Sequence, residues 1–271
     1  MLKLKVLVDN YAYIDNYYLA EPALSYYIEC DNKRILFDAG YSDAYIINAK
    51  KMGINLNNLD YVVLSHSHND HTGGLTYLVK QYDLSNTVLV THPKTLSKKY
   101  KDAIYIGAPM FVNDLKPYFK EVITTDKPYD LTDNLKYLGQ IERNNDYENK
   151  NPVGYELKDG VKIDDYNIDD SCLAYKNDKG IFVISACSHS GVCNMVEYSK
   201  KIFNNNVVKL VIGGFHLFDD NEVLDKTINY LGSCNIDDLY PCHCVSLVCK
   251  HKMMEKLNVH EVGVGLQVIV D

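Results

Sequence analysis

Residues 64–74 read Leu64-Ser65-His66-Ser67-His68-Asn69-Asp70-His71-Thr72-Gly73-Gly74 and place three imidazoles and one carboxylate within six positions. In extended backbone, residues two apart point to the same side, so His66 and His68 can reach one metal ion together. Asp70 and His71 fall where the chain should turn into a helix, which aims them at a neighbouring position. The spacing therefore suits two adjacent ions. The alternative, a polar loop that is merely rich in histidine, fits poorly with the strand before it and the glycines after it.

The residues before this segment predict a hairpin, a helix and a strand. Residues 25–30 and 34–38 flank the turn Asp31-Asn32-Lys33, which is typical of a hairpin. Apolar residues at helical spacing over 45–52 predict a helix, and Gly53 stands where a C-terminal cap belongs. The strand 61–64 then runs directly into His66.

A second stretch repeats this pattern. Residues 172–175 and 180–184 flank the turn Asn177-Asp178-Lys179, and a helix with Ser190 as a candidate N-cap follows. The next strand, 210–212, runs into Gly213-Gly214-Phe215-His216. Two such units, each a sheet with helices outside, pack sheet against sheet. The predicted fold is therefore an α/β, four-layer αββα sandwich, in which histidines from both halves meet at one edge.

The chain is interpreted as one domain over residues 1–271, because this length suffices for a single large core. The middle, residues 93–170, lacks clear periodicity. It carries prolines at positions 93, 109, 117, 128 and 152. We expect loops and short elements over the site there, and the sequence assigns no further structure to this part.

Composition and charge favour a cytoplasmic protein with a small-molecule substrate. No apolar run approaches the roughly 20 residues that cross a bilayer, and residues 1–8 alternate like a strand, unlike a secretion signal. A net charge of −8 argues against nucleic-acid partners, which attract basic surfaces. The basic cluster Lys94, Lys98, Lys99 and Lys101 is interpreted as a solvated helix face. The eight cysteines are expected to be reduced thiols.

The run His66-Ser67-His68-Asn69-Asp70-His71 reproduces the pattern H-x-H-x-D-H, and through it the sequence resembles the metallo-β-lactamase superfamily. The preceding strand, Ile35-Leu36-Phe37-Asp38-Ala39-Gly40, also resembles that family. The resemblance implies one ion held by His66, His68 and a later histidine. It implies a second ion held by Asp70, His71 and a histidine near the C-terminus.

Two histidines are candidates to complete these sets. His189 follows the second predicted hairpin and is assigned to the first ion, with a capping or surface histidine as the alternative. His243 lies at a strand end in Pro241-Cys242-His243-Cys244, with its side chain expected opposite to both cysteines. It is assigned to the second ion, with a satisfied core histidine as the alternative.

One position departs from the family. The resemblance calls for an aspartate after the second hairpin to bridge the ions, yet residues 183–189 contain no carboxylate. Cys187 shares a face with His189 if the segment is extended, so its thiolate could approach the metals. The site could instead hold one ion tightly, with Cys187 as a small buried residue.

The combination Cys187-Ser188-His189-Ser190-Gly191, Gly213-Gly214-Phe215-His216-Leu217 and Pro241-Cys242-His243-Cys244 resembles a narrower branch of the superfamily. That branch includes archaeal dihydropterin ribofuranosyl-aminobenzene phosphate synthases beside many uncharacterised metal-dependent hydrolases. The stretch 139–143 resembles it as well. His216 is thereby a candidate to touch substrate or metal, with a structural role as the alternative.

The predicted function is that of a metal-dependent hydrolase. A metal-bound water would attack an ester, lactone, amide or phosphoester, with Asp70 orienting the water and His216 or the second ion stabilising the oxyanion. Asp38 is expected to support a ligand histidine rather than to bind metal. The alternatives are synthase-like group transfer by the same ligands and a catalytically silent metal sensor.

The expected cofactor is zinc, as one or two ions, with manganese or iron as alternatives. The expected partners are a small-molecule substrate, with neither nucleic acid nor membrane. The sequence leaves the substrate and the oligomeric state open.

Overall fold

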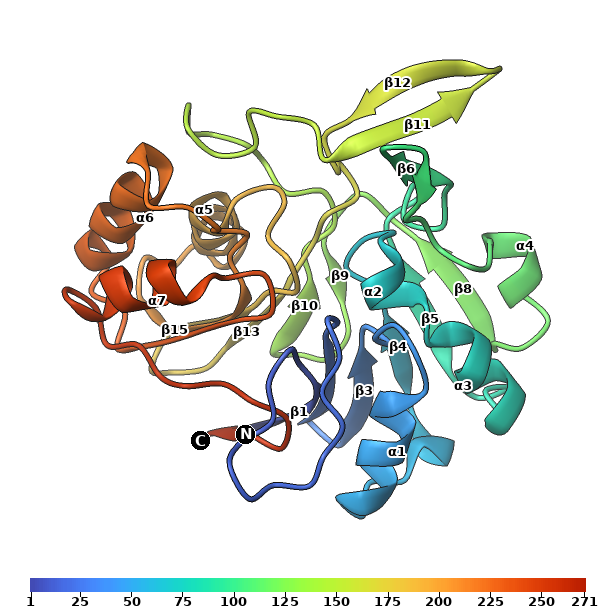
Figure 1. Ribbon diagram of the computed structural model, residues 1–271. Coiled ribbons are helices and arrows are strands. Elements are labelled where there is room, and N and C mark those ends of the chain that lie inside the picture. The colour runs from blue at the N-terminus through green and yellow to red at the C-terminus, as the bar shows by residue number, and fades with distance from the viewer.

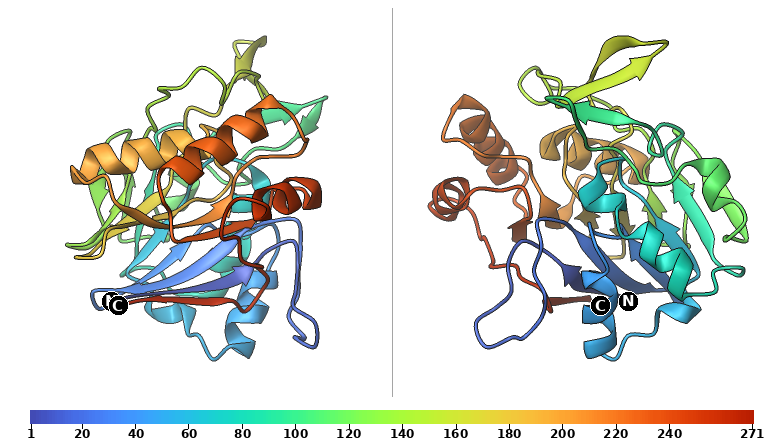
Figure 2. Two further views of the ribbon diagram at one scale, coloured as in Figure 1. Left: turned by 90° about the vertical axis from the view of Figure 1, so that its left-hand side faces the viewer. Right: turned by 45° about the vertical axis from the view of Figure 1, so that its right-hand side comes forward.

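The computed structural model describes residues 1–271 and has the four predicted layers, with two sheets packed face to face between two layers of helices (Figure 1). The first sheet has seven strands. In spatial order they are β17 (Gln267–Val270), β1 (Leu2–Val8), β2 (Ser25–Cys30), β3 (Lys33–Phe37), β4 (Tyr61–Val63), β5 (Val88–Thr91) and β8 (Glu121–Thr124). Pairing of β1 with β17 brings the two chain ends side by side (Figure 2).

The second sheet has six strands. In spatial order they are β16 (Asp238–Cys242), β15 (Val208–Gly214), β14 (Ile181–Ile184), β13 (Leu173–Lys176), β10 (Leu135–Tyr137) and β9 (Tyr129–Asp130). Both predicted hairpins are present, as β2–β3 and β13–β14. In the first of them, Asp31 and Asn32 have φ values of 49° and 62°, as the tight turns that join two strands require.

Helices cover the outer face of each sheet. The first sheet carries α1 (Ala44–Lys51), a short 3₁₀ helix (Leu56–Asn58), α2 (Asn69–Thr72), α3 (Leu75–Gln81) and α4 (Val112–Leu115). The second carries α5 (Val192–Phe203), α6 (Glu222–Ser233) and α7 (Leu247–Met254). None of these helices combines the length and the apolarity that a membrane crossing needs.

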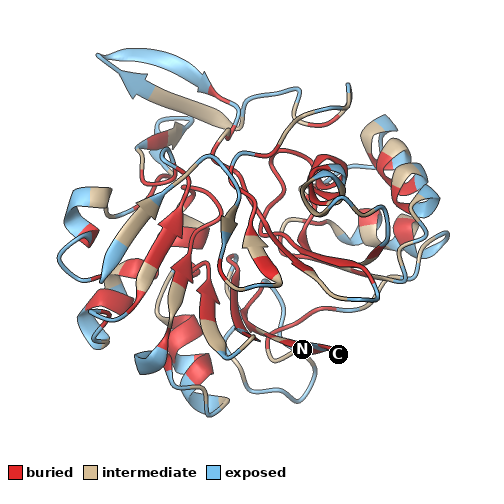
Figure 3. Ribbon diagram, turned by 180° about the vertical axis from the view of Figure 1, so that it is seen from behind, coloured by how far each residue is buried: buried red, intermediate tan, exposed pale blue.

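Three apolar clusters hold the layers together, and each fills one of the three interfaces. The central cluster has 25 buried residues and joins the inner faces of the two sheets, with Phe37 and Ile184 among its members. The other two have 23 and 22 buried residues and join each sheet to its own helices. The strands at the centre of the molecule are accordingly buried along most of their length (Figure 3).

The middle segment has more structure than the sequence assigned to it. Its strand β8 extends the first sheet, and β9 and β10 extend the second. The remainder forms a small third sheet of β12 (Val161–Asp165), β11 (Gly154–Lys158), β6 (Lys99–Lys101) and β7 (Ile104–Tyr105). The β11–β12 hairpin projects from the body of the molecule (Figure 1). The basic cluster thus lies around a strand rather than on a helix face, and Lys99 is buried.

The start of α5 differs from the prediction. Ser190 does not cap the helix, because its hydroxyl donates to a carboxylate oxygen of Asp170 at 2.7 Å. Glu148 takes the capping role by accepting the backbone N–H groups of Cys193 at 3.0 Å and Asn194 at 2.9 Å. An acidic side chain from the middle segment therefore satisfies the helix start and stabilises its positive end.

Parallel pairing decides where the site lies. Strand β3 runs parallel to β4, and β14, β15 and β16 are parallel to one another. The carboxyl ends of such strands gather at one edge, where loops are free to carry functional side chains. The residues that leave these ends are Asp38, His66, Cys187, His189, His216, His243 and Cys244.

Candidate metal centre

The first predicted ligand set is assembled at this edge. His66, His68 and His189 are buried, and their ring nitrogens lie within 4.8 Å of one another. Nε2 of His66 is 3.1 Å from Nδ1 of His68, and the ring of His189 has its centroid 4.7 Å from each of the other two. Neither nitrogen of His189 has a hydrogen-bond partner. A buried imidazole without partners is costly, and an ion held by one nitrogen of each of the three rings would lower that cost.

The second predicted set lies beside the first. Nε2 of His71 is 3.2 Å from Nε2 of His243, and Oδ2 of Asp70 is 3.6 Å and 3.4 Å from these two nitrogens. The ring centroids of His66 and His71 are 4.3 Å apart, so the two sets are adjacent. One set offers three nitrogens and the other offers two nitrogens and an oxygen, and both donor sets suit divalent ions such as zinc.

The two sets differ in charge. Burial and neighbouring imidazoles lower the pKa of His66 and His189, and burial lowers that of His68 to about 3. Burial also acts to lower the pKa of His71, but Asp70 and Asp38 outweigh it and raise the value to about 9. The pKa of Asp70 is lowered because His71 and His243 outweigh the effect of burial. At pH 7 the three histidines of the first set are therefore neutral, as metal binding requires, whereas His71 of the second set carries a proton.

Asp38 contacts one histidine of each set, directly or through Ser65. His71 donates its Nδ1–H to Oδ2 of Asp38 at 2.7 Å, which leaves Nε2 free. His66 donates its Nδ1–H to the hydroxyl of Ser65 at 2.9 Å, and that hydroxyl donates to the same oxygen of Asp38 at 2.7 Å. Hydrogen bonds of this kind fix the ring tautomer and orientation that a metal needs.

The sequence did not single out two supporting residues near His243. The side chain of Asn10 accepts the Nδ1–H of His243 at 3.1 Å, and Asp9 accepts its backbone N–H at 2.8 Å. Both follow β1, which runs in the same direction as β3 because each pairs antiparallel with β2. An Asp-Asn pair directly after a buried strand was the signal that could have revealed them.

Asn167 supports His68 in the same way. Its side-chain Nδ2 lies 3.2 Å from Nε2 of His68, while its own Oδ1 is buried without a partner. The two ends of an amide group are interchangeable in shape, and turning the group by 180° lets Oδ1 accept the Nε2–H of His68. This orientation satisfies both groups and directs Nδ1 of His68 to the first set.

A buried lysine anchors the ligand loop to the third sheet. Nζ of Lys99 lies 2.8 Å from Asp165 and 2.6 Å from Asp169. Asp169 also accepts the backbone N–H of Ser67 at 2.8 Å, and Ser67 lies between His66 and His68. Lys99 therefore holds the loop that carries two of the predicted ligands, although the sequence indicated it only as one member of a surface cluster.

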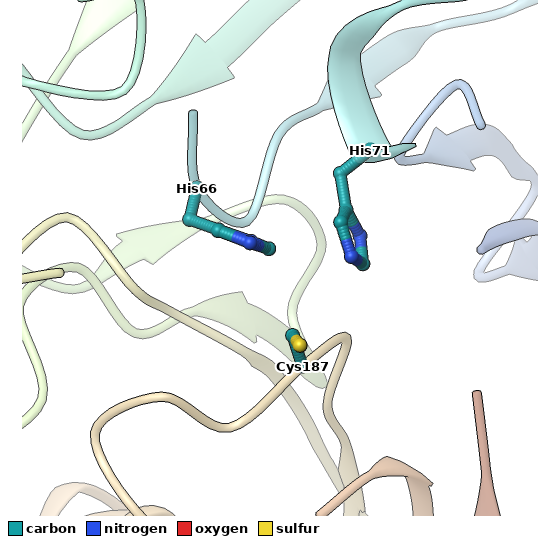
Figure 4. A group of neighbouring side chains, drawn as sticks. All are labelled: His66, His71 and Cys187. Atoms are coloured by element: carbon teal, nitrogen blue, oxygen red, sulfur yellow. The ribbon is translucent and has the colours of Figure 1, made fainter. Parts of the chain in front are cut away.

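Cys187 lies between the two ligand sets. Its sulfur and the ring nitrogens of His66 and His71 lie within 4.8 Å of one another, and Figure 4 shows it facing both rings. This is the place where the resemblance calls for a bridging carboxylate. Cys187 is also 3.7 Å from Nδ1 of His216, whose ring packs on His189 with a centroid distance of 4.3 Å.

The sequence did not predict that Cys244 lies at the site, because the backbone changes direction just before it. Strict alternation predicted that His243 points away from both flanking cysteines. Strand β16 ends at Cys242, and His243 adopts a φ of 51°, which breaks the alternation. Asp38, Ser188 and His216 also have positive φ values. Such conformations are rare outside glycine and gather where function requires them.

A cavity of about 630 Å³ opens over the centre. Asp70, His189 and His216 line its wall together with Cys187 and Cys244. Aromatic, apolar and polar residues form the remainder of the wall, among them Tyr11, Tyr41, Phe218, Ile106, Lys101 and Ser246. The structure therefore brings all nine predicted site residues to one place, with Asp38 behind the predicted metal ligands.

An αββα sandwich with two adjacent ligand sets at one sheet edge defines a class of metal-dependent proteins. Residues 19–194 match the model of the metallo-beta-lactamase superfamily, and the chain belongs to this superfamily. The family and the fold predicted from the sequence are thereby confirmed. Members of this superfamily bind divalent metals.

Individual relatives are similar over the whole chain. One is the 7,8-dihydropterin-6-methyl-4-(beta-D-ribofuranosyl)-aminobenzene-5'-phosphate synthase of Methanocaldococcus jannaschii, with 32% identity over 95% of this chain and 92% of the relative. An uncharacterised protein of the same archaeon is 33% identical over 94% of this chain and 95% of its own length. The crystal structure of Tm1679, a metal-dependent hydrolase of the beta-lactamase superfamily, has a TM-score of 0.86 and 26% identity and covers 100% of this chain and 99% of its own.

Proposed function

We propose that this protein is a metal-dependent hydrolase of small molecules that works with one or two zinc ions. The observation that carries the proposal is the pair of adjacent three-residue sets at the base of the cavity. His66, His68 and His189 would hold one ion, and Asp70, His71 and His243 the other. When bound, the ions supply an acidified water and a positive charge for a developing oxyanion.

The protein's own groups divide the remaining work. Asp70 is partly exposed in the cavity and is kept ionised, so it can accept a hydrogen bond from the attacking water. His216 is partly exposed in the same wall and sits beside the first set, where it can donate a hydrogen bond to the substrate oxygen. Asp38 holds His71 and, through Ser65, His66 in place. The buried residues of the site would thus hold the ligands in place, while Asp70 and His216 in the cavity wall would contact the substrate.

The cavity wall indicates the kind of substrate. Tyr41 and Phe218 present exposed aromatic surface, and Lys101 contributes a positive charge at the rim. We infer a compact molecule that has an apolar or aromatic part, a negative group and a hydrolysable ester, lactone, amide or phosphoester bond. The net charge of −8 favours such a molecule over a nucleic acid as the partner.

A second candidate function is group transfer like that of a synthase. The observation that favours it is the 32% identity to the Methanocaldococcus jannaschii synthase over nearly the whole of both chains. The same ligand sets and the same cavity would serve to position two reactants instead of a substrate and water.

One experiment separates the two functions. Zinc-loaded protein is incubated with a panel of lactones, phosphodiesters and aryl esters in water enriched in ¹⁸O, and products are analysed by mass spectrometry. Hydrolysis places the label in the product. If no panel member reacts and a phosphorylated aromatic donor is converted only when a pterin acceptor is present, the hydrolase proposal is wrong and transfer is supported.

Metal binding is expected to release protons unequally. In the metal-free protein the first set is neutral at pH 7, whereas His71, with a pKa of about 9, holds a proton that the second ion must displace. The second equivalent of zinc should therefore release about one proton more than the first at pH 7. Above pH 9 this excess should disappear, because His71 has already lost its proton.

Calorimetry in two buffers of different ionisation enthalpy measures this release. The variant Cys187→Ala is used so that no thiol proton contributes. Equal release for both equivalents at pH 7 would contradict the assignment of His71 to the second ion.

Cys187 is expected to set how tightly the second ion binds. It occupies the place of a charged bridging oxygen, and carboxylates hold two cations close together better than a neutral group does. Cys187→Asp should therefore tighten zinc binding at the second site by about tenfold or more, which is about 1.4 kcal/mol. Cys187→Ala should weaken it. Competition titration against a zinc chelator measures both, and equal affinities in all three proteins would show that Cys187 only fills space.

A further inference from the structure

Two cysteines from different strand ends meet beside the proposed metal centre. Cys187 follows β14 and Cys244 follows β16, and their sulfur atoms are 3.1 Å apart. The sulfur atoms of a disulfide are about 2.0 Å apart, so closure needs a movement of about 1 Å. Gly214 makes the approach possible, because a Cβ atom there would lie 2.6 Å from the sulfur of Cys244.

Small reagents can reach the pair from the cavity. Both residues line the cavity, but Cys187 is only 3% exposed, whereas Cys244 is partly exposed. A reagent in the cavity therefore meets Cys244 first, with Cys187 directly behind it. An accessible thiol backed by a second thiol is the arrangement that converts an oxidised cysteine into a disulfide.

We propose that Cys187 and Cys244 are a redox pair, which hydrogen peroxide closes to a reversible disulfide that withdraws Cys187 from the metal centre. The effect on metal rests on the proposed function, whereas the disulfide itself does not. Cys187 has one sulfur atom to offer, which either faces His66 and His71 or bonds to Cys244. Oxidation thus replaces the free thiol between the two ligand sets by a neutral disulfide sulfur, which binds metal poorly.

The chemistry is balanced with peroxide as the oxidant. The sulfur of Cys244 attacks one oxygen of hydrogen peroxide, the O–O bond breaks, and water leaves as Cys244 becomes a sulfenic acid. The sulfur of Cys187 then attacks that of Cys244, the S–O bond breaks, and a second water leaves with the thiol proton of Cys187. Dithiothreitol reverses the bond by two thiol exchanges and is itself oxidised.

The experiment treats the full-length protein with a small excess of hydrogen peroxide, both metal-free and loaded with zinc. The number of reactive thiols, counted after denaturation, should fall by two of the eight. Peptide mass spectrometry should find Cys187 linked to Cys244. In the loaded protein, the zinc retained after gel filtration should fall by about one ion per chain, and dithiothreitol followed by zinc should restore it.

Two variants serve as matched tests. Cys244→Ser should keep its zinc under the same treatment, whereas Cys234→Ser, which removes a thiol of similar exposure elsewhere, should behave like the native chain. Equal zinc loss from Cys244→Ser, or no 187–244 linkage in metal-free protein, would overturn the switch. Protection of both thiols by an additional zinc ion would overturn it too and replace it with a metal site. A linkage formed without any zinc site would leave the pair standing and the proposed function wrong.

Discussion

Replacing His66 and His68 together with alanine is expected to leave no more than one zinc ion per chain and to reduce hydrolysis by about a thousandfold or more. Loss of both side chains leaves His189 as the sole member of the first set, and one imidazole does not hold a divalent ion against water. An activated water lowers the barrier by several kcal/mol, and each 1.36 kcal/mol is a factor of ten in rate. Elemental analysis and turnover of the best substrate measure the two effects.

The matched control removes two imidazoles outside the centre. His251 is exposed on α7, and His260 packs on Tyr240, so the double variant His251→Ala, His260→Ala should keep full metal and activity. Full zinc loading of His66→Ala, His68→Ala would show that the ligand assignment is wrong. A fall in activity with unchanged metal would instead place these histidines in substrate binding.

Replacing Lys99 with methionine is expected to lower the free energy of unfolding by about 3–5 kcal/mol. The change removes the positive charge between Asp165 and Asp169, and both of these carboxylates are buried. A buried charge that loses its partner is far more costly than the net value of the pair. The zinc affinity of the first set should fall as well, because Asp169 positions the backbone at Ser67 between two ligands.

Urea unfolding of the metal-free protein measures the stability change. Lys101→Met is the control, since Lys101 lies on the same strand but is exposed and should change the unfolding free energy by less than about 0.5 kcal/mol. A loss below about 1 kcal/mol in Lys99→Met would mean that Asp165 and Asp169 find other partners or take up protons at little cost.

Much of the fold could be predicted because the sequence carries one physical pattern twice. Each hairpin, helix and following strand has its own apolar periodicity, and the histidines stand directly after the strands. The middle segment could not be assigned, since β8, β9 and β10 are short strands that owe their place to neighbours far away in the chain. Their pairing is a property of the assembled sheets rather than of local sequence.

The site shows the same division. His66, His68, Asp70 and His71 lie within one motif, so spacing alone brought them together. Lys99 looked like a surface lysine because Asp165 and Asp169, which neutralise it, are distant in sequence. Cys244 was not predicted at the site because the positive φ of His243 changes the direction in which the next side chain points, against strand alternation. Contacts between residues distant in sequence and rare backbone conformations cannot be predicted from a single sequence.

The split of each ligand set between the two sheets has a consequence for unfolding. Each set takes two residues from the first half of the chain and one, His189 or His243, from the second. An ion bound to both halves favours only states in which they are in register, by about 2.7 kcal/mol when free metal is at a hundredfold excess over the dissociation constant. Without metal, we expect the second half to open more readily, and hydrogen exchange there would report its local stability. With metal at the proposed ligands, we expect the two halves to open together as one cooperative unit.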